Sequence, residues 1–284
     1  MRGRKKKVRL WGGLLLLLWL CPLSAAWAAA EALRIVSANL CADRLLLSLV
    51  ERERVLAVSQ FAAEPALSTV VRQAQGVPSN QGDLEELVAL RPDLVLLGAL
   101  QASTTGKMLQ QMGIAVFIVA QAETLEQVRH GMRTLAQRLG AQARAEALLA
   151  DMDRRLQALA QQAARRTHTV RAVVYQAGGW SSGQGTLSDA LFNHLHIRNV
   201  AGDLQGFGAL PLENLVAANP DWIIVESMVE EGNSIAGELL RHPVLKRSGM
   251  RFVHIPMRLW ACPDTALVDA AELMSGQISE AVKK

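Results

Sequence analysis

The sequence of 284 residues lacks the short motifs that mark the commonest enzyme classes. It has no C-x-x-C redox pair, no G-x-S-x-G nucleophile turn, no phosphate-binding loop and no dinucleotide-binding glycine fingerprint. None of its six histidines stands at H-E-x-x-H or a similar metal-binding spacing. The pair His194 and His196 is more typical of solvated or structural histidines. We therefore predict no catalytic residue, no metal site and no cofactor.

Cysteine is scarce as well, with three residues in the whole chain. Cys21 lies in the N-terminal segment discussed next, which leaves Cys41 and Cys262. In an oxidising compartment an even pair favours one disulfide, so we predict a Cys41–Cys262 bridge. The alternative is two buried thiols that pack as small apolar residues.

Long apolar runs are absent after the first thirty residues. Residues 1–30 carry six basic residues, then an apolar run over residues 10–20, then small residues with A-x-A sites that end at Ala28 or Ala30. This order predicts a cleaved secretory signal peptide; the alternative is an uncleaved N-terminal anchor. Since no later stretch reaches about 18 apolar residues, the exported product is expected to be soluble. Cleavage leaves 24 basic residues against 26 acidic ones, so the charge gives no reason to expect nucleic acid binding.

Two stretches of the chain, 128 positions apart, are nearly the same. L-E-E-L-V-A-L-R-P-D-L-V-L-L begins at Leu84 and L-E-N-L-V-A-A-N-P-D-W-I-I-V begins at Leu212, with seven of fourteen positions identical. Each copy predicts a short helix that ends before a proline, followed by an aspartate and a buried strand. A repeat at this distance is not a solenoid and indicates two similar lobes.

The rest of the chain also alternates between strand and helix patterns, which indicates α/β lobes with central parallel sheets. We predict strands at 34–37, 55–59, 115–119, 170–175 and 251–255, with helices between them. The long helical pattern over residues 141–166 predicts one stiff helix that joins the lobes. The expected organisation is a signal peptide (1–30), an N-terminal lobe (31–140), the connecting helix (141–166) and a C-terminal lobe (167–284).

Aromatic residues make up only 4% of the chain, yet several fall where predicted strands end. Ligands of parallel α/β sheets bind beyond the carboxyl ends of the strands. Large rings there favour a cleft for a bulky ligand with apolar faces, although each ring alone could be ordinary packing. These rings are Phe61, Tyr175, Trp180, Phe207 and Trp260. The polar residues placed to assist them are Asn39, Gln60, Asn80, Gln101 and Gln176.

The mature chain resembles the periplasmic substrate-binding proteins that serve ABC importers of iron–siderophore complexes and cobalamin. The resemblance is carried by R-I-V-S-A-N-L-C-A-D from Arg34, by both repeat copies, by V-Y-Q-A-G-G-W-S-S-G-Q-G-T-L from Val174 and by L-W-A-C-P-D-T from Leu259. It implies two Rossmann-like lobes joined by one long backbone helix, with the ligand between them and little hinge motion.

The resemblance also implies roles for individual residues. It places ligand contacts at Asn39, Phe61, Asn80, Tyr175, Trp180 and Trp260. It places contacts with the transporter at Glu85 and Glu213, although glutamate in the first turn of a helix is favoured by the helix dipole in any case. Cys262-Pro263-Asp264 departs from the family's usual Gly-Pro turn with an arginine, so an arginine contact to an anionic ligand is not expected there; Arg258 is a possible substitute.

These features predict a periplasmic, monomeric binding protein with no enzymatic activity. Its expected ligand is an iron–siderophore or cobalamin-like complex, and its expected partner is an inner-membrane ABC permease dimer. One alternative is direct capture of zinc or manganese, which would need several converging His, Asp or Glu ligands. The other is an exported enzyme on a chelatase-like scaffold.

Overall fold

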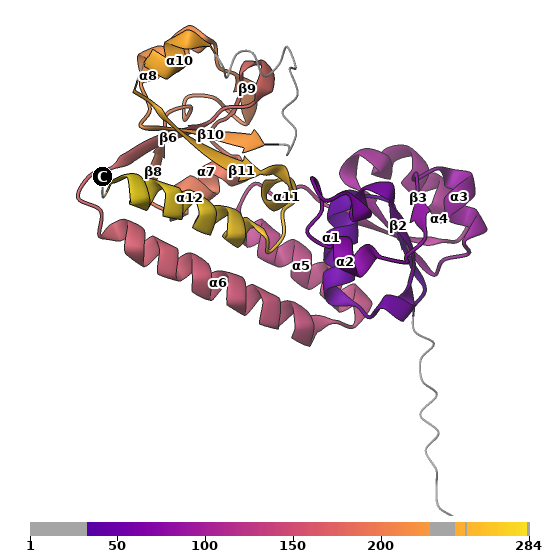
Figure 1. Ribbon diagram of the computed structural model, residues 1–284. Coiled ribbons are helices and arrows are strands. Elements are labelled where there is room, and N and C mark those ends of the chain that lie inside the picture. Colours follow the sequence, from indigo (N-terminus) through magenta and orange to yellow (C-terminus); the bar gives the residue numbers. More distant parts are fainter. Residues whose placement is uncertain (1–32, 228–241, 248, 283–284) are drawn as a thin grey trace, which may run out of the picture. The chain divides into compact units, whose positions relative to one another are not determined.

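The computed structural model describes residues 33–227, 242–247 and 249–282 (Figure 1). The predicted signal peptide lies outside these ranges. Within them, no helix is both long enough and apolar enough to cross a membrane. Residues Leu33–Lys284 form one compact unit.

The first sheet contains five parallel strands. In spatial order they are β3 (Ser79–Asn80), β2 (Val55–Ser59), β1 (Ile35–Ser37), β4 (Leu94–Gly98) and β5 (Ala115–Val119). Four helices connect them: α1 (Leu40–Leu49), α2 (Val71–Ala74), α3 (Leu84–Ala89) and α4 (Lys107–Gln111). Every residue of β4 is buried, as expected for a central strand that is covered on both faces. The chain runs outward from β1 to β3 and then continues on the other side, so the strand order reverses between β1 and β4.

The second sheet contains four parallel strands. In spatial order they are β11 (Arg251–Pro256), β10 (Trp222–Ser227), β6 (Val170–Val174) and β8 (Ile197–Asn199). Its helices are α7 (Leu187–His194), α8 (Leu212–Ala218), α10 (Pro243–Arg247), α11 (Met257–Trp260) and α12 (Leu267–Val282). Here the strand order reverses between β6 and β10. A separate antiparallel ribbon pairs β7 (Trp180–Ser182) with β9 (Phe207–Ala209).

Two consecutive helices connect the sheets, α5 (Leu125–Leu139) and α6 (Gln142–Ala164). Gly140 separates them in a left-handed conformation with φ of 69°, which suits a residue without a side chain. The 23 residues of α6 span about 35 Å at the α-helical rise, and Figure 1 shows α6 running beside α5 and α12.

Arginines on α5 and α6 bind carboxylates on the neighbouring helix. Arg129 lies 2.7 Å from Asp153 between α5 and α6, and Arg155 lies 2.6 Å from Glu272 between α6 and α12. These pairs are partly exposed, so each contributes modestly to stability. Their main effect is to hold the three helices in one register.

Helix α5 is preceded by Thr124, whose side chain caps the first turn. The Thr124 hydroxyl accepts a hydrogen bond from the Gln127 amide, and the Gln127 side chain accepts one from the Glu123 amide at 2.6 Å. Threonine is among the preferred residues at this position, because its side-chain oxygen satisfies an amide that has no partner within the helix.

The repeated segments have the same backbone conformation in both lobes. Arg91 and Asn219, which precede the two prolines, have positive φ values of 48° and 43°. The following aspartates each accept a hydrogen bond from a backbone amide at the start of the first strand of their lobe. These bonds are Arg34 N to Asp93 at 2.7 Å and Arg171 N to Asp221 at 2.8 Å. The repeated Pro-Asp therefore ends a helix and aligns the next strand.

The expected fold class is confirmed: two parallel α/β sheets are joined by a long helix. One apolar core runs from the first sheet through α5 and α6 to α12, with Leu46, Leu149 and Met274 among its fully buried members. A continuous core of this kind restricts movement of one sheet against the other. The sequence pattern missed the shortest elements, namely α2, β3, β7, β8, β9, α10 and α11.

Candidate functional site: cavities at the carboxyl ends of the strands

Side chains that follow the carboxyl ends of the strands line two cavities in the described part of the chain. One has a volume of about 330 Å³ and lies at the ends of β1, β2 and β4. The other has a volume of about 480 Å³ and is lined by residues 121–123 after β5 and by residues after β6, β10 and β11. Both include a point where the strand order reverses, which is where ligands bind in open α/β sheets.

The first cavity contains the two asparagines that were predicted as ligand contacts. Asn39 caps α1, because its Oδ1 accepts hydrogen bonds from the amides of Cys41 and Ala42. Asn80 is buried, and its Nδ2 donates to Ser37 O and to Val58 O, both at 2.8 Å. Both amides therefore hold the backbone at the cavity wall, a role that the sequence did not indicate.

Phe61 projects at the rim of the first cavity. It lies in a short helical turn after β2 and 46% of its surface is exposed. An exposed ring beside a cavity is available for contact with an apolar ligand face.

The second cavity combines apolar and polar side chains. Phe207, Met257 and Trp260 form much of its apolar wall, and Gln176 and Glu226 belong to its polar lining. Trp260 therefore lies where the sequence placed it, next to the expected cleft.

Glu226 was not predicted, and it occupies the strand-order reversal of the second sheet. It is the next-to-last residue of β10, and Gln176 follows β6, the neighbouring strand. Burial raises the pKa of the Glu226 carboxyl, and a hydrogen bond from the Gln176 side chain partly opposes this. The available signal was a single charged residue directly after the apolar strand residues of the second repeat copy.

Trp180 lies on the two-stranded ribbon beside the second cavity. It is paired with Ala209, which puts it diagonally across from Phe207 on the same face of the ribbon. The two rings are 52% and 64% exposed, the most exposed large aromatic side chains of the second lobe that are described. Phe207 lines the second cavity together with Trp260, whereas Trp180 is not among the lining residues of either cavity.

Tyr175 is not among the residues that line either cavity, and its ligand contact stays a prediction. Its side chain is fully buried, and its hydroxyl donates to Leu210 O at 3.2 Å. The reason is its position one residue after β6, where the side chain turns into the core below the ribbon. Desolvation raises the pKa of its hydroxyl, and the nearby Glu213 raises it further.

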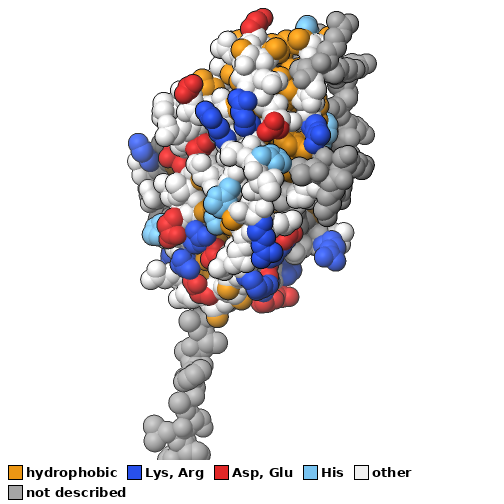
Figure 2. All heavy atoms as spheres, turned by 90° about the vertical axis from the view of Figure 1, so that its left-hand side faces the viewer, with side chains coloured by type: hydrophobic (Ala, Val, Ile, Leu, Met, Phe, Trp, Pro, Cys, Tyr) orange, Lys and Arg blue, Asp and Glu red, His pale blue; other side chains and the backbone are white. Residues whose placement is uncertain are grey.

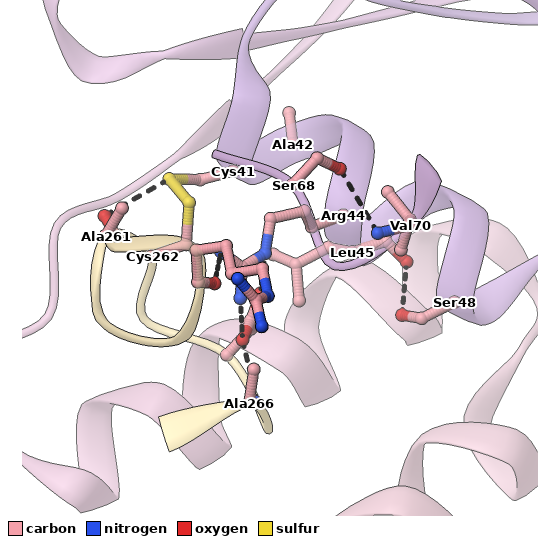
Figure 3. A network of polar contacts seen from close by, with 12 residues as sticks. Cys41, Ala42, Arg44, Leu45, Ser48, Ser68, Val70, Ala261, Cys262 and Ala266 are labelled. Atoms are coloured by element: carbon pink, nitrogen blue, oxygen red, sulfur yellow. Dashed lines mark hydrogen bonds and ion pairs between the residues drawn. A yellow bond between two sulfur atoms is a disulfide. The ribbon is translucent and has the colours of Figure 1, made fainter. Parts of the chain in front are cut away.

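Cys41 and Cys262, the pair expected from the sequence, are joined by a disulfide (Figure 3). Beside it, the buried Arg44 of α1 binds the buried Asp264, with Nη2 2.8 Å from Oδ1 and Nε 2.6 Å from Oδ2. Arg44 also donates to Arg258 O at 2.6 Å. Burial raises the pKa of Asp264, and the Arg44 guanidinium opposes that effect. A covalent bond and a bidentate ion pair thus fasten α1 to the loop before α12.

This arrangement explains the departure from the usual Gly-Pro turn. Asp264 is used to pair Arg44, and Cys262 is used in the disulfide. Arg258 does not belong to the lining of either cavity, so the lining gives no support to its role as a substitute arginine.

Positive charge is absent from the lining of both cavities in the ranges that the structure describes. Their charged lining residues are Glu123 and Glu226, and no lysine, arginine or histidine belongs to either set. The described residues also contain no group of three His, Cys, Asp or Glu able to hold a metal ion. On the face seen in Figure 2, acidic and basic side chains are interspersed.

The two glutamates expected to contact a transporter are both exposed in the first turn of a helix. Glu85 lies in α3 and Glu213 in α8. Each helix leads into a strand, β4 or β10, and runs back across its sheet, so its first turn lies at the edge where the strands end. The two carboxylates therefore share an edge with the cavities.

Comparison with known proteins bears on this site. Residues 35–249 match the model of a family described as "Periplasmic binding protein". A cobalamin-binding protein of Halobacterium salinarum is 30% identical over 217 residues, which cover 74% of this chain and 58% of that protein. The chain thus spans little more than half of the length of this curated relative.

Solved structures with low sequence identity share the fold. The periplasmic haem-binding protein of Vibrio cholerae has a TM-score of 0.72 at 18% identity, covering 87% of this chain and 99% of its own. The vitamin B12-binding protein of Vibrio cholerae has a TM-score of 0.67 at 17% identity, covering 88% of this chain and 98% of its own.

Proposed function

The chain belongs to the periplasmic binding protein family, and on this premise we propose that it binds a corrinoid outside the cytoplasm and delivers it to an ABC importer. In this role the protein has no enzymatic activity. The ligand is cobalamin-like and lies across the two cavities at the carboxyl ends of the strands.

The observation that carries the choice of ligand is the charge of the cavity lining. Haem carries propionates and ferric catecholates are anionic, so each would need a cationic partner when it is desolvated. Neither cavity offers such a partner among the lining residues that the structure describes. The rim of a corrin ring carries neutral amides, which suit a lining of glutamine, asparagine and serine. The cobalamin-binding relative supports the same choice.

The exposed rings suit the apolar faces of such a ligand. Phe61 lines one cavity and Phe207 and Trp260 line the other, while the exposed Trp180 lies near Phe207 on the same face of the ribbon. Apolar contact of this kind contributes most of the affinity in ligand sites, while a few polar groups fix orientation.

Tryptophan emission tests the proposal directly. Cyanocobalamin absorbs in the range where tryptophan emits, so binding should quench the protein's fluorescence, with a dissociation constant in the micromolar range or below. Trp260→Phe should reduce the quenching and weaken binding, whereas Trp222→Phe, at the opposite end of β10, should leave the dissociation constant unchanged. Haem and a ferric catecholate are the comparison ligands.

Two results would overturn the proposal. One is unchanged emission with cyanocobalamin up to high micromolar concentration. The other is tighter binding of haem or the ferric catecholate than of cyanocobalamin. Tighter binding of a neutral ferric hydroxamate would instead assign the protein to siderophore uptake.

Glu85 and Glu213 are proposed to contact the permease. Two exposed carboxylates at equivalent repeat positions suit a dimer that presents one basic site per subunit, and charge-assisted contacts would fix the orientation of the complex. The Glu85→Ala/Glu213→Ala variant should keep ligand affinity and lose uptake. Glu53→Ala is the control, because this exposed glutamate precedes β2 and lies at the opposite edge of the sheet. Normal uptake by the double variant at limiting expression would remove the proposal.

A further inference from the structure

The two lobes differ in one pair of residues at their strand-order reversals. In the first lobe Ala38 N donates to Leu96 O, and in the second lobe Tyr175 N donates to Ile224 O. Asn39 and Gln176 each follow the donor residue directly, so they occupy equivalent positions. Gly98 and Glu226 each lie two residues after the acceptor residue, so they are equivalent as well. A glycine in one lobe is therefore replaced by a carboxyl group in the other.

The first lobe shows that the fold does not need a carboxyl group at this position. A Cβ on Gly98 would lie 2.6 Å from the Asn39 amide nitrogen, so the asparagine side chain fills the space. In the second lobe the space holds Glu226, whose carboxyl is hydrogen-bonded by Gln176 and lines the larger cavity. Glu226 is thus an addition to the common framework, placed where α/β sheets bind ligands.

Among the residues that the structure describes, those that line the cavity of Glu226 include no cation. A partly buried carboxylate without a cation loses solvation, and the raised pKa of Glu226 reflects this cost. The Gln176 amide offsets only part of it. A hydrogen-bond donor on the ligand would complete the pairing, whereas a carboxylate on the ligand would bring two like charges together.

We propose that Glu226 is a specificity-determining residue, which accepts a hydrogen bond from a carboxamide N–H of the bound corrinoid and rejects corrinoids with a carboxylate at that place. This inference rests on the proposed function. It adds to that function the ligand group that is recognised and the residue that recognises it.

The test compares cyanocobalamin with the isomeric monocarboxylic acids obtained by mild hydrolysis of its peripheral amides. In the wild-type protein, at least one isomer should bind more weakly than cyanocobalamin by about tenfold or more, since like charges in contact cost more than about 1.4 kcal/mol. In Glu226→Gln the same isomer should bind within about threefold of cyanocobalamin. The glutamine is isosteric and still accepts a hydrogen bond. The ratio of two dissociation constants on one sample is also independent of the folded fraction.

Glu53→Gln is the matched control, because Glu53 is exposed and lines neither cavity. It should leave the ratio for every isomer within about twofold of the wild-type value, as expected for a screened surface charge. Ratios that are the same in Glu226→Gln and wild type for every isomer would overturn this inference and leave the proposed function intact. Wild-type protein that binds no corrinoid would overturn both.

Discussion

Asp43 provides a direct test of the electrostatics beneath the first cavity. It lies in the first turn of α1, is fully buried, and accepts hydrogen bonds from Ser59 N at 3.0 Å and from Ser59 Oγ at 2.5 Å. Burial raises the pKa of its carboxyl from 3.8 to about 6, although hydrogen bonds from Ser37 and Ser59 act in the opposite direction. The perturbation is Asp43→Asn, which resembles the protonated side chain in shape and charge.

The sign and size of the effect follow from linkage. With a pKa near 3.8 when unfolded and about 6 when folded, the folded state binds more protons between these values. Stability is therefore greatest at low pH and is lost as the pH rises through about 6. The full contribution is about 3 kcal/mol, of which about 2 kcal/mol falls between roughly pH 4.5 and pH 7.

The assay is urea denaturation of the wild type and of Asp43→Asn at several pH values in this range. The quantity of interest is the difference between their free energies of unfolding. The variant should gain about 2 kcal/mol relative to the wild type as the pH rises from about 4.5 to 7. Other carboxyls with raised pKa values, such as Asp264 and Glu226, cancel in this difference.

A difference that stays constant across the range would refute the reasoning, whatever its absolute value. Asp203→Asn, which removes a negative charge from an exposed position, controls for the change in net charge. A gain of the same size in Asp203→Asn would show that net charge, rather than burial of Asp43, causes the effect.

Three further predictions concern the fastening of α1 and the processing of the chain. Unfolded, unreduced mature protein should give no free thiol on titration, and Cys41→Ser/Cys262→Ser should lower the free energy of unfolding by up to about 5 kcal/mol, since the bridge joins residues 221 apart. Free thiols in the wild type would contradict the bridge. Arg44→Met should lower the free energy of unfolding by about 3–5 kcal/mol, because it leaves the buried Asp264 without its cation. Adding Asp264→Leu should restore part of that free energy. A double variant no more stable than Arg44→Met would argue against this. N-terminal sequencing of exported protein should begin after residue 28 or 30, and a chain that still begins at Met1 would exclude cleavage.

Much of the fold could be predicted from local sequence patterns. The repeated Pro-Asp segments, the buried strands and the long helix depend on residue period, on proline and on glycine, which act over a few positions. Two placements in the site, Phe61 and Trp260 at cavity walls, followed from one topological rule about where parallel strands end. The Cys41–Cys262 disulfide could be predicted because only these two cysteines remain after the signal peptide.

The roles of the polar residues were decided by the tertiary structure alone. In a sequence, an asparagine that contacts a ligand cannot be told from one that holds the backbone. Only the hydrogen bonds from Asn80 to the carbonyls of Ser37 and Val58 show that it holds the backbone here. Tyr175 was placed correctly at a strand end, but the direction of its side chain depends on how the ribbon lies over it.

Glu226 shows the limit most clearly. Its neighbours in the sequence predict that it lies on a strand. The equivalent position of the first lobe is Gly98, so the repeat does not predict a carboxyl group there. Its chemistry depends on the cavity formed by segments far apart in the chain, which removes water and, among its described lining residues, supplies no cation. Local sequence determines backbone conformation through short-range sterics and hydrogen bonds. Solvation and charge pairing depend on every segment that packs around a group, and so only the folded chain decides them.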